Sequence, residues 1–288
     1  MRLIFRAFFI FMVPLYGIGT QMLIIPSSAE ELSIGSHSTL PGMLPINPAL
    51  YSSRNESPEI LLNRGTWLGG ISLTQIGYNQ KFGEKVFHLG LKYSGVADLE
   101  FRENIPKDIS YANFSAYGLI IDSGFGFQLK KHRFGISFSY IHFGLYTAES
   151  KGVGIDFGYF IDIKNGYSAG LVAKNIGKMN KLNLESPRLP KRFSIGLSKH
   201  IEYDSINNTV FASLDWNSVV TSSKFYFGNR LNWNRLYILA GYSSSKEVRE
   251  SSFGIGLNFN RFKITYGTRM GSQDLGFPKI LSFEFLLP

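Results

Sequence analysis

The segment that decides the fold is YGLIIDSGFGFQLKKHRFGISFSYIHF, residues 117–143. Bulky apolar side chains take most odd positions from Tyr117 to Leu129, while glycine and polar residues take most even ones. After Lys131-His132 the pattern resumes, with bulky residues at the even positions from Phe134 to Tyr140. A period of two is typical of a β-strand with two different faces. We therefore predict two long strands joined by a short turn.

The same alternation recurs along most of the chain. The strongest turn signal is Asn165-Gly166, because both residues tolerate the positive φ of a type I′ turn. Short turns are expected at one end of the strands and longer links at the other. Thirteen strands are predicted near residues 67–79, 85–93, 117–130, 133–143, 153–163, 167–175, 192–200, 209–217, 224–233, 235–243, 251–259, 262–267 and 279–286. The longer links are predicted at residues 94–116, 144–152, 176–191, 217–223, 244–250 and 268–278.

Composition narrows the class of β protein. The 288 residues include 30 Gly, 25 Phe, 15 Tyr and 3 Trp but no Cys, and only 18% are charged. Such a chain is neither disordered nor a disulfide scaffold. Strands of about ten residues can cross a bilayer at a tilt, and an aromatic face opposite a glycine-rich polar face suits lipid outside and lumen inside. A soluble β-sandwich is the alternative, but its outer face would carry more charge.

Parity predicts one more strand. Bacterial single-chain barrels have an even number of strands, so we expect a fourteenth near Ile60 to Gly65. A change of phase between Leu73 and Ile76 predicts a bulge near Thr74-Gln75. The predicted fold is all-β, a transmembrane antiparallel β-barrel of about 14 strands over residues 59–288.

The N-terminus predicts export. Residues 1–29 combine Arg2 and Arg6 with an apolar stretch and the small residues Ser27-Ser28-Ala29, as in a cleaved signal peptide. An uncleaved membrane anchor is the alternative. Residues 30–58 are too polar and proline-rich for a strand, so we expect an N-terminal plug or cap. The expected location is the outer membrane of a Gram-negative bacterium.

One turn in this plug segment is a candidate functional feature. It consists of Asn47, Pro48, Ala49 and Leu50. Proline fixes φ and asparagine can bond its own backbone, so the sequence predicts a tight turn. We expect this turn to wedge inside the barrel.

Catalytic and cofactor chemistry is not expected. The five histidines are far apart, which argues against a metal site, and no cofactor motif is present. Residues 166–170 match the G-x-S-x-G pattern around Ser168, but that motif needs a following helix, and a strand is predicted here. With His200 and Glu185 as the only downstream partners, an outer-membrane lipase is a minor alternative.

Charged residues recur on the face predicted to line the lumen. Their signs are mixed, which favours a salt-bridged interior over an ion-selective pore. The lumen-facing candidates are Asp122, Asp156, Asp162, Lys174, Arg192, Asp215, Lys224, Arg230, Lys263 and Glu284.

Several short motifs resemble one family of barrels. PINPALYSS (45–53) resembles the N-terminal motif of the PorV/PorQ family, a branch of barrels similar to the FadL fatty-acid transporters. Residues 168–178, the Leu189-Pro190 loop end with the strand after it, and the last hairpin and closing strand (251–285) are also similar. The resemblance implies a 14-stranded outer-membrane barrel whose N-terminal segment enters or caps the lumen.

The resemblance implies two possible functions, both non-enzymatic. The first is a docking or shuttling component for protein export or surface attachment in type IX secretion, with secretion-system or cargo proteins as partners. The alternative is a FadL-like channel that passes hydrophobic small molecules sideways through the wall. An apolar cavity between plug and wall beside a kinked strand would favour transport. A closed, charge-filled lumen would favour docking.

Overall fold

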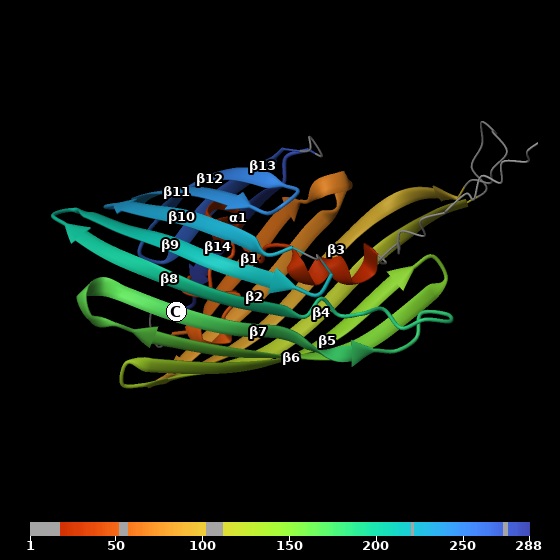
Figure 1. The fold of residues 1–288 in the computed structure, drawn as a ribbon, viewed down its shortest axis with the longest axis horizontal. Coiled ribbons are helices and arrows are strands. Elements are labelled where there is room, and N and C mark those ends of the chain that lie inside the picture. The colour runs from red at the N-terminus through yellow and green to blue at the C-terminus, as the bar shows by residue number, and fades with distance from the viewer. Residues whose placement is uncertain (1–17, 52–56, 102–111, 220–221, 273–275) are drawn as a thin grey trace, which may run out of the picture.

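The chain forms a closed antiparallel β-barrel of fourteen strands (Figure 1). The computed structural model describes residues 18–51, 57–101, 112–219, 222–272 and 276–288. The strands are β1 (Glu59–Thr66), β2 (Ser72–Phe82), β3 (Lys85–Phe101), β4 (Ala112–Leu129), β5 (His132–Leu145), β6 (Ala148–Asp162), β7 (Tyr167–Met179), β8 (Arg192–Tyr203), β9 (Ile206–Asn217), β10 (Lys224–Trp233), β11 (Leu236–Ser244), β12 (Arg249–Asn258), β13 (Phe262–Gly271) and β14 (Lys279–Leu286). The helical turns are η1 (Ile18–Ile24), α1 (Ala29–Ile34), η2 (Pro48–Leu50), η3 (Leu68–Gly70) and η4 (Lys164–Gly166).

Consecutive strands pair around the ring, and β1 closes it by pairing with β14 from Glu59↔Leu286 to Thr66↔Lys279. The predicted fourteenth strand is β1, which confirms the argument from parity. Closure leaves no sheet edge, so the backbone groups of the strands bond within the wall. No helix within the described ranges is long and apolar enough to span a membrane.

The two faces of the wall differ as the alternation predicts. Large apolar side chains such as Phe125, Phe138 and Phe253 point outward, and about half of each is exposed. Small and polar residues on the same strands point into the lumen, including Ser137 and Thr265, which are buried. An apolar exterior around a polar interior is the pattern of a membrane barrel.

Two predicted connections are longer than those in the structure. The link predicted at 94–116 is shorter, because β3 continues to Phe101 and β4 starts at Ala112. The link predicted at 144–152 shrinks to two residues between β5 and β6. Alternation predicts these strand ends poorly because the charged residues Asp98, Glu100 and Glu149 interrupt the apolar pattern there.

The bulge predicted near Thr74-Gln75 is also wrong. β2 pairs without a register shift on both sides. It starts only at Ser72, after the 3-10 turn η3, so Leu73 points into the lumen and is buried, while Ile76 points outward. Leu73 therefore belongs to the core around the N-terminal segment rather than to the lipid face.

Two other strands do carry irregularities. In β3 the pairing with β4 shifts between Val96 and Leu99, and Asp98 has a φ of 58°. In β7 the pairing with β6 shifts beside Asn175, which has a φ of 59°. A bulge of this kind bends its strand and weakens the local ladder.

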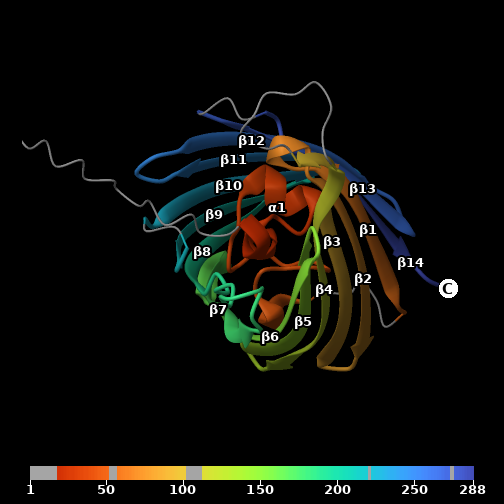
Figure 2. The ribbon, with the colours of Figure 1, turned by 90° about the vertical axis from the view of Figure 1, so that its right-hand side faces the viewer.

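The N-terminal segment lies inside the barrel (Figure 2). α1 contacts β10 to β14, and η2 contacts β4 to β6. Ala29, Leu32 and Ile34 of α1 are fully buried against the wall. Folding of the wall therefore creates a lumen that the same chain largely fills.

Glycines allow the wall to approach η2 closely. A Cβ atom added to Gly135 of β5 would overlap the backbone of Pro48 and Ala49. We expect Gly135→Ala to lower the free energy of unfolding by about 1–3 kcal/mol, as overpacking does. The matched control is Gly271→Ala in β13, where the nearest atom would be 3.8 Å from the added Cβ. Urea titrations of both variants that gave equal midpoints would contradict this packing account.

Candidate functional site

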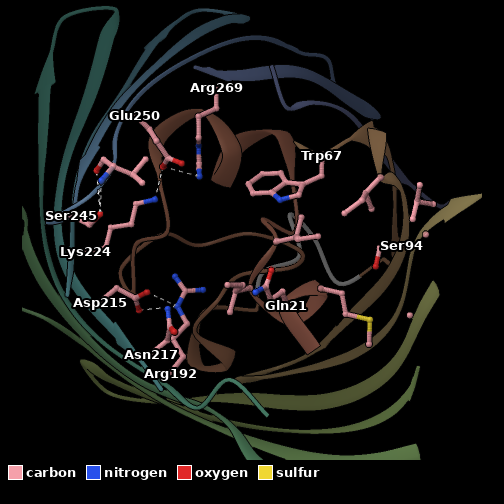
Figure 3. Close-up of a pocket in the computed structure, with 18 of the residues that line it drawn as sticks. Gln21, Trp67, Ser94, Arg192, Asp215, Asn217, Lys224, Ser245, Glu250 and Arg269 are labelled. Atoms are coloured by element: carbon pink, nitrogen blue, oxygen red, sulfur yellow. Dashed lines mark hydrogen bonds and ion pairs between the residues drawn. The ribbon is translucent and has the colours of Figure 1, made fainter. Parts of the chain in front are cut away.

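A cavity of about 300 Å³ lies at the end of the lumen where the longer connections are (Figure 3). The N-terminal segment forms one side of this lumen cavity through Met22 and Ile25, and the ends of the strands form the others. It is thus a space between the segment and the wall, where a hydrophobic ligand could be enclosed.

One side of the lumen cavity is apolar. Met22 and Ile25 pack with Phe143 in a core cluster, and Trp67 and Ile71 pack against it. All five side chains line the cavity. Close packing keeps these walls in place, so the apolar surface is preformed.

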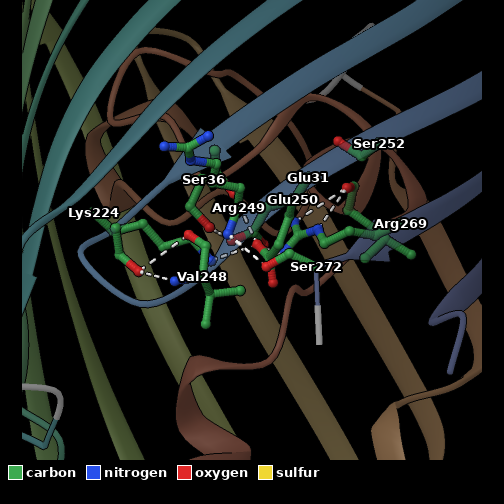
Figure 4. A network of polar contacts seen from close by, with 12 residues as sticks. Glu31, Ser36, Lys224, Val248, Arg249, Glu250, Ser252, Arg269 and Ser272 are labelled. Carbon is green, nitrogen blue, oxygen red and sulfur yellow. Dashed lines mark hydrogen bonds and ion pairs between the residues drawn. The ribbon is translucent and has the colours of Figure 1, made fainter. Parts of the chain in front are cut away.

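The opposite side of the lumen cavity is lined by charged side chains that form ion pairs. Arg192 Nε donates to both carboxylate oxygens of Asp215, at 2.8 and 2.9 Å. Glu250 accepts from Lys224 Nζ at 2.5 Å and lies 3.5 Å from Arg269 Nη1 (Figure 4). These five groups carry one excess positive charge. The cavity therefore offers an apolar side and a cationic polar side to one ligand.

The bulged strand lies beside this cavity. Val96 is the last residue of β3 before the register shift, and its partner Ala116 is on β4. Both line the cavity. The described pairing of β2 with β3 ends at Gly95, so the β2 ladder does not extend to Val96 and the residues after it.

A second group of residues, which is polar, lies farther along the lumen than the cavity. His88 bonds Asp122 at 2.9 Å and Asn79 at 2.5 Å, and its ring stacks on Tyr51 with centroids 4.4 Å apart. The polar atoms of this group are hydrogen-bonded to one another, and they leave only a small cavity of about 70 Å³ beside His88 and Asp122.

The third group centres on Glu30 of α1. Its carboxylate accepts from Arg230 Nη1 at 2.8 Å and from Lys263 Nζ at 3.2 Å. Lys263 also pairs with Glu284 at 3.1 Å. Burial alone would raise the pKa of Glu30, but the two cations outweigh it and lower that pKa to about 2. Glu30 is therefore the ion that anchors α1 to β10 and β13.

His37 is the other buried titratable group of the N-terminal segment. Its Nε2 lies 2.8 Å from the Ile34 carbonyl oxygen, and its Nδ1 lies 2.9 Å from Ser213 Oγ. A carbonyl can only accept, so Nε2 carries the proton and Nδ1 accepts from Ser213. Burial lowers the pKa of His37 to about 4, so the ring is neutral at pH 7.

The turn at Asn47 to Leu50 lies in the lumen against β5 and β6. Asn47 Oδ1 accepts from the Ala49 N–H at 3.0 Å. Asn47 Nδ2 donates to the carbonyl oxygens of Ser38 at 2.7 Å and Tyr159 at 3.0 Å. One side chain thus bonds the turn, the rest of the N-terminal segment and the wall.

The charged residues singled out in the sequence fall into separate ion-paired groups. Lys174 lies 3.3 Å from Asp156, and Asp162 lies 3.2 Å from Arg133 near a short turn. Arg192, Asp215 and Lys224 line the lumen cavity. Arg230 and Lys263 pair with Glu30, and Lys263 also pairs with Glu284. Sequence reasoning missed Glu30, Glu250, Arg269 and His88.

The described part of the chain contains no candidate metal centre. No three His, Cys, Asp or Glu residues there are placed to share a metal ion. Ser168 Oγ donates to Asp162 at 3.1 Å, while His200 contacts Thr209 and Glu202. Among these contacts, Ser168 has a carboxylate and no histidine as its partner.

No protein-family profile matches the sequence, and no curated protein matches it. Solved membrane channels share its fold. A TodX monoaromatic hydrocarbon channel mutant matches with a TM-score of 0.65 and 12% identity, over 90% of this chain and 99% of that chain. The toluene transporter TodX of Pseudomonas putida gives 0.63 and 12%, over 90% and 97%. The CymD monoaromatic hydrocarbon channel gives 0.59 and 10%, over 90% and 97%. At such identities the likeness establishes the fold alone.

Proposed function

We propose that this protein is a non-enzymatic outer-membrane channel for hydrophobic small molecules. The observation that carries the proposal is the lumen cavity between the N-terminal segment and the wall, next to the bulged strand β3. An apolar cavity between plug and wall, beside a kinked strand, is the arrangement expected of a transport protein. The same fold in hydrocarbon channels supports it.

The two sides of the cavity define the class of ligand. Met22, Trp67 and Phe143 provide an apolar surface, whereas Lys224 and Arg269 provide donors with one excess positive charge. A hydrophobic molecule with one polar, hydrogen-bond-accepting end satisfies both sides. A fully polar solute would leave the apolar side without a partner.

The route is proposed to run from the loop end into the cavity and sideways past β3. The described pairing of β2 with β3 ends at Gly95, and the bulge next to Val96 weakens the ladder of β3. Straight passage along the lumen is obstructed by α1 and by the polar group at His88. A sideways exit delivers an apolar ligand to lipid, where it is most soluble.

The export-docking role implied by the PorV/PorQ resemblance remains a prediction. None of the channels named above is described as a secretion component. The charged groups at His88 and Glu30 do fill part of the lumen, as docking would suggest. The open lumen cavity favours transport over docking.

A cavity-filling substitution tests the proposal. Ala116→Phe places a large side chain in the lumen cavity, whereas Ala240→Phe adds the same side chain to the exposed outer face of β11. We expect Ala116→Phe to weaken binding about tenfold or more, because overpacking costs about 1–3 kcal/mol and 1.4 kcal/mol is a factor of ten. Ala240→Phe should bind like the unaltered protein.

Binding is measured by quenching of Trp67 fluorescence in detergent, with naphthalene, decanoate and sucrose as probes. Trp67 lines the cavity, while Trp216 and Trp233 are on the outer face. The Trp67→Phe variant provides the background signal. Uptake of the three probes into proteoliposomes should rank them in the same order as binding does. Equal binding by Ala116→Phe and Ala240→Phe would rule out the cavity as the site.

A further inference from the structure

The strongest unexplained feature is the set of contacts made by the ten residues before Glu30. These residues fall within the predicted signal peptide, residues 1–29. Within the barrel, however, Thr20, Met22, Ile25 and Ala29 are all buried. A leader that is removed before the barrel folds has no reason to match its lumen so closely.

Polar groups of the wall are satisfied by the backbone of this segment. Lys92 Nζ donates to the Ile25 carbonyl oxygen at 2.6 Å. Gln75 Nε2 lies 3.3 Å from the Pro26 carbonyl oxygen, and Asn63 Nδ2 donates to that of Ser27 at 2.6 Å. Three successive carbonyls thus meet three lumen side chains from β3, β2 and β1. Removal of the segment would take these acceptors from Lys92, Gln75 and Asn63, of which the last two are fully buried.

The residues on either side of the predicted cut after Ala29 are part of α1 and its cap. Ser28 is the N-cap residue, and its Oγ accepts from the Glu31 N–H at 3.1 Å. The Ala29 N–H donates to Ser282 Oγ at 2.8 Å. A cut after Ala29 would remove the cap and both residues, which would cost about 1 kcal/mol for the cap alone.

An earlier boundary fits the sequence better. Residues 7–16 are a run of ten residues, AFFIFMVPLY, within the length expected of the apolar core of a signal peptide. Gly17 and Gly19 then provide small residues at the third and first positions before Thr20. Thr20 itself contacts the barrel, since its Oγ1 donates to the Arg188 carbonyl oxygen at 2.8 Å.

We propose that signal peptidase cleaves between Gly19 and Thr20, so that residues 20–29 remain in the mature protein as a built-in wall of the lumen cavity. The step is hydrolysis of one peptide bond: water adds across it, leaving a carboxylate on Gly19 and an α-ammonium on Thr20. Met22 and Ile25 then belong to the mature channel, and Met22 fills the space beside Gly118 of β4.

The test is the N-terminal sequence and intact mass of the full chain, expressed with its own leader in a Gram-negative host. The expected mature chain begins Thr-Gln-Met and is ten residues longer than one that begins at Glu30. A chain that begins at Glu30, or one that keeps Met1, would overturn the proposal.

A matched pair of variants locates the cut independently. Gly17→Leu places a large residue three positions before the proposed bond, and Ser27→Leu does the same for a cut after Ala29. We expect the precursor to accumulate at least several-fold with Gly17→Leu and not with Ser27→Leu. Masses are taken on denatured whole-cell protein, so they report cleavage whether or not the variant folds. The reverse pattern would place the cut after Ala29.

Discussion

Glu30→Gln is expected to lower the free energy of unfolding by about 3–5 kcal/mol, as loss of one partner from a buried ion pair does. Glutamine keeps the size of the side chain but removes the charge that holds Arg230 and Lys263 at 2.8 and 3.2 Å. Lys263 retains Glu284, so the uncompensated cation is Arg230. The pKa of Glu30, about 2 against 4.5 for a free glutamate, supports a similar size of about 3 kcal/mol.

Urea titrations at pH 7 measure the loss. Glu247→Gln is the control, because Glu247 lies on an exposed connection and should change the free energy of unfolding by less than about 0.5 kcal/mol. The double variant Glu30→Gln/Arg230→Met removes the uncompensated cation and should recover part of the stability. If the double variant is no more stable than Glu30→Gln, charge pairing is not what anchors α1.

The same substitution should release α1 from the wall. The chain has no cysteine, so a single Ser33→Cys substitution places one thiol on α1 where the side chain is fully buried. We expect slow labelling of this thiol in the otherwise unaltered barrel and faster labelling once Glu30→Gln is added. Equal labelling rates would show that α1 stays docked without its ion pairs.

Much of the wall could be predicted from the sequence because lipid imposes a strict rule. Every outward position must be apolar, so Phe125 and Phe138 mark the phase of their strands wherever the membrane contacts them. Leu73 packs against the N-terminal segment instead, and beyond Val96 the charged residues Asp98 and Glu100 interrupt the apolar pattern. Those are the places where the predicted bulge and the predicted link at 94–116 were wrong.

The lumen could be predicted only in part, for a different reason. Alternation identifies Arg192, Asp215 and Lys263 as inward-facing, but it does not identify their partners. Glu30 lies more than two hundred residues from Lys263 in the sequence, and no local pattern links them. Glu30 follows directly after the predicted signal peptide, where no sequence pattern indicates a partner in the wall. The cavity itself depends on how the N-terminal segment packs, which periodicity does not describe.

The second large effect is expected on acidification, and His37 determines where it begins. The pKa of its neutral, buried ring is about 4, against 6.5 when the residue is free. Between these values the unfolded chain binds a proton and the folded chain does not, so stability falls as the pH falls. Between pH 7 and pH 4.5 this should cost about 2–3 kcal/mol.

Glu30 affects stability in a separate and lower range of pH. Its folded pKa of about 2 lies below the free value of 4.5, so its stabilisation is complete above pH 4.5 and is lost as the pH falls toward 2. A titration of stability should therefore show a first loss assigned to His37 and a second, below pH 4.5, assigned to Glu30. Urea midpoints followed by tryptophan fluorescence at pH 7, 5.5, 4.5 and 3 resolve the two.

His37→Gln isolates the first step, because its amide can still donate to the Ile34 carbonyl oxygen but does not titrate. We expect the pH dependence between 6.5 and 4.5 to flatten in this variant while the loss below pH 4.5 remains. His200→Gln is the matched control, since the side chain of His200 is 44% exposed, and it should keep both steps. If His37→Gln retains the full loss above pH 4.5, the acid sensitivity arises from the wall and not from the N-terminal segment. If the loss disappears, protonation of one buried histidine determines how firmly this segment is held in the lumen.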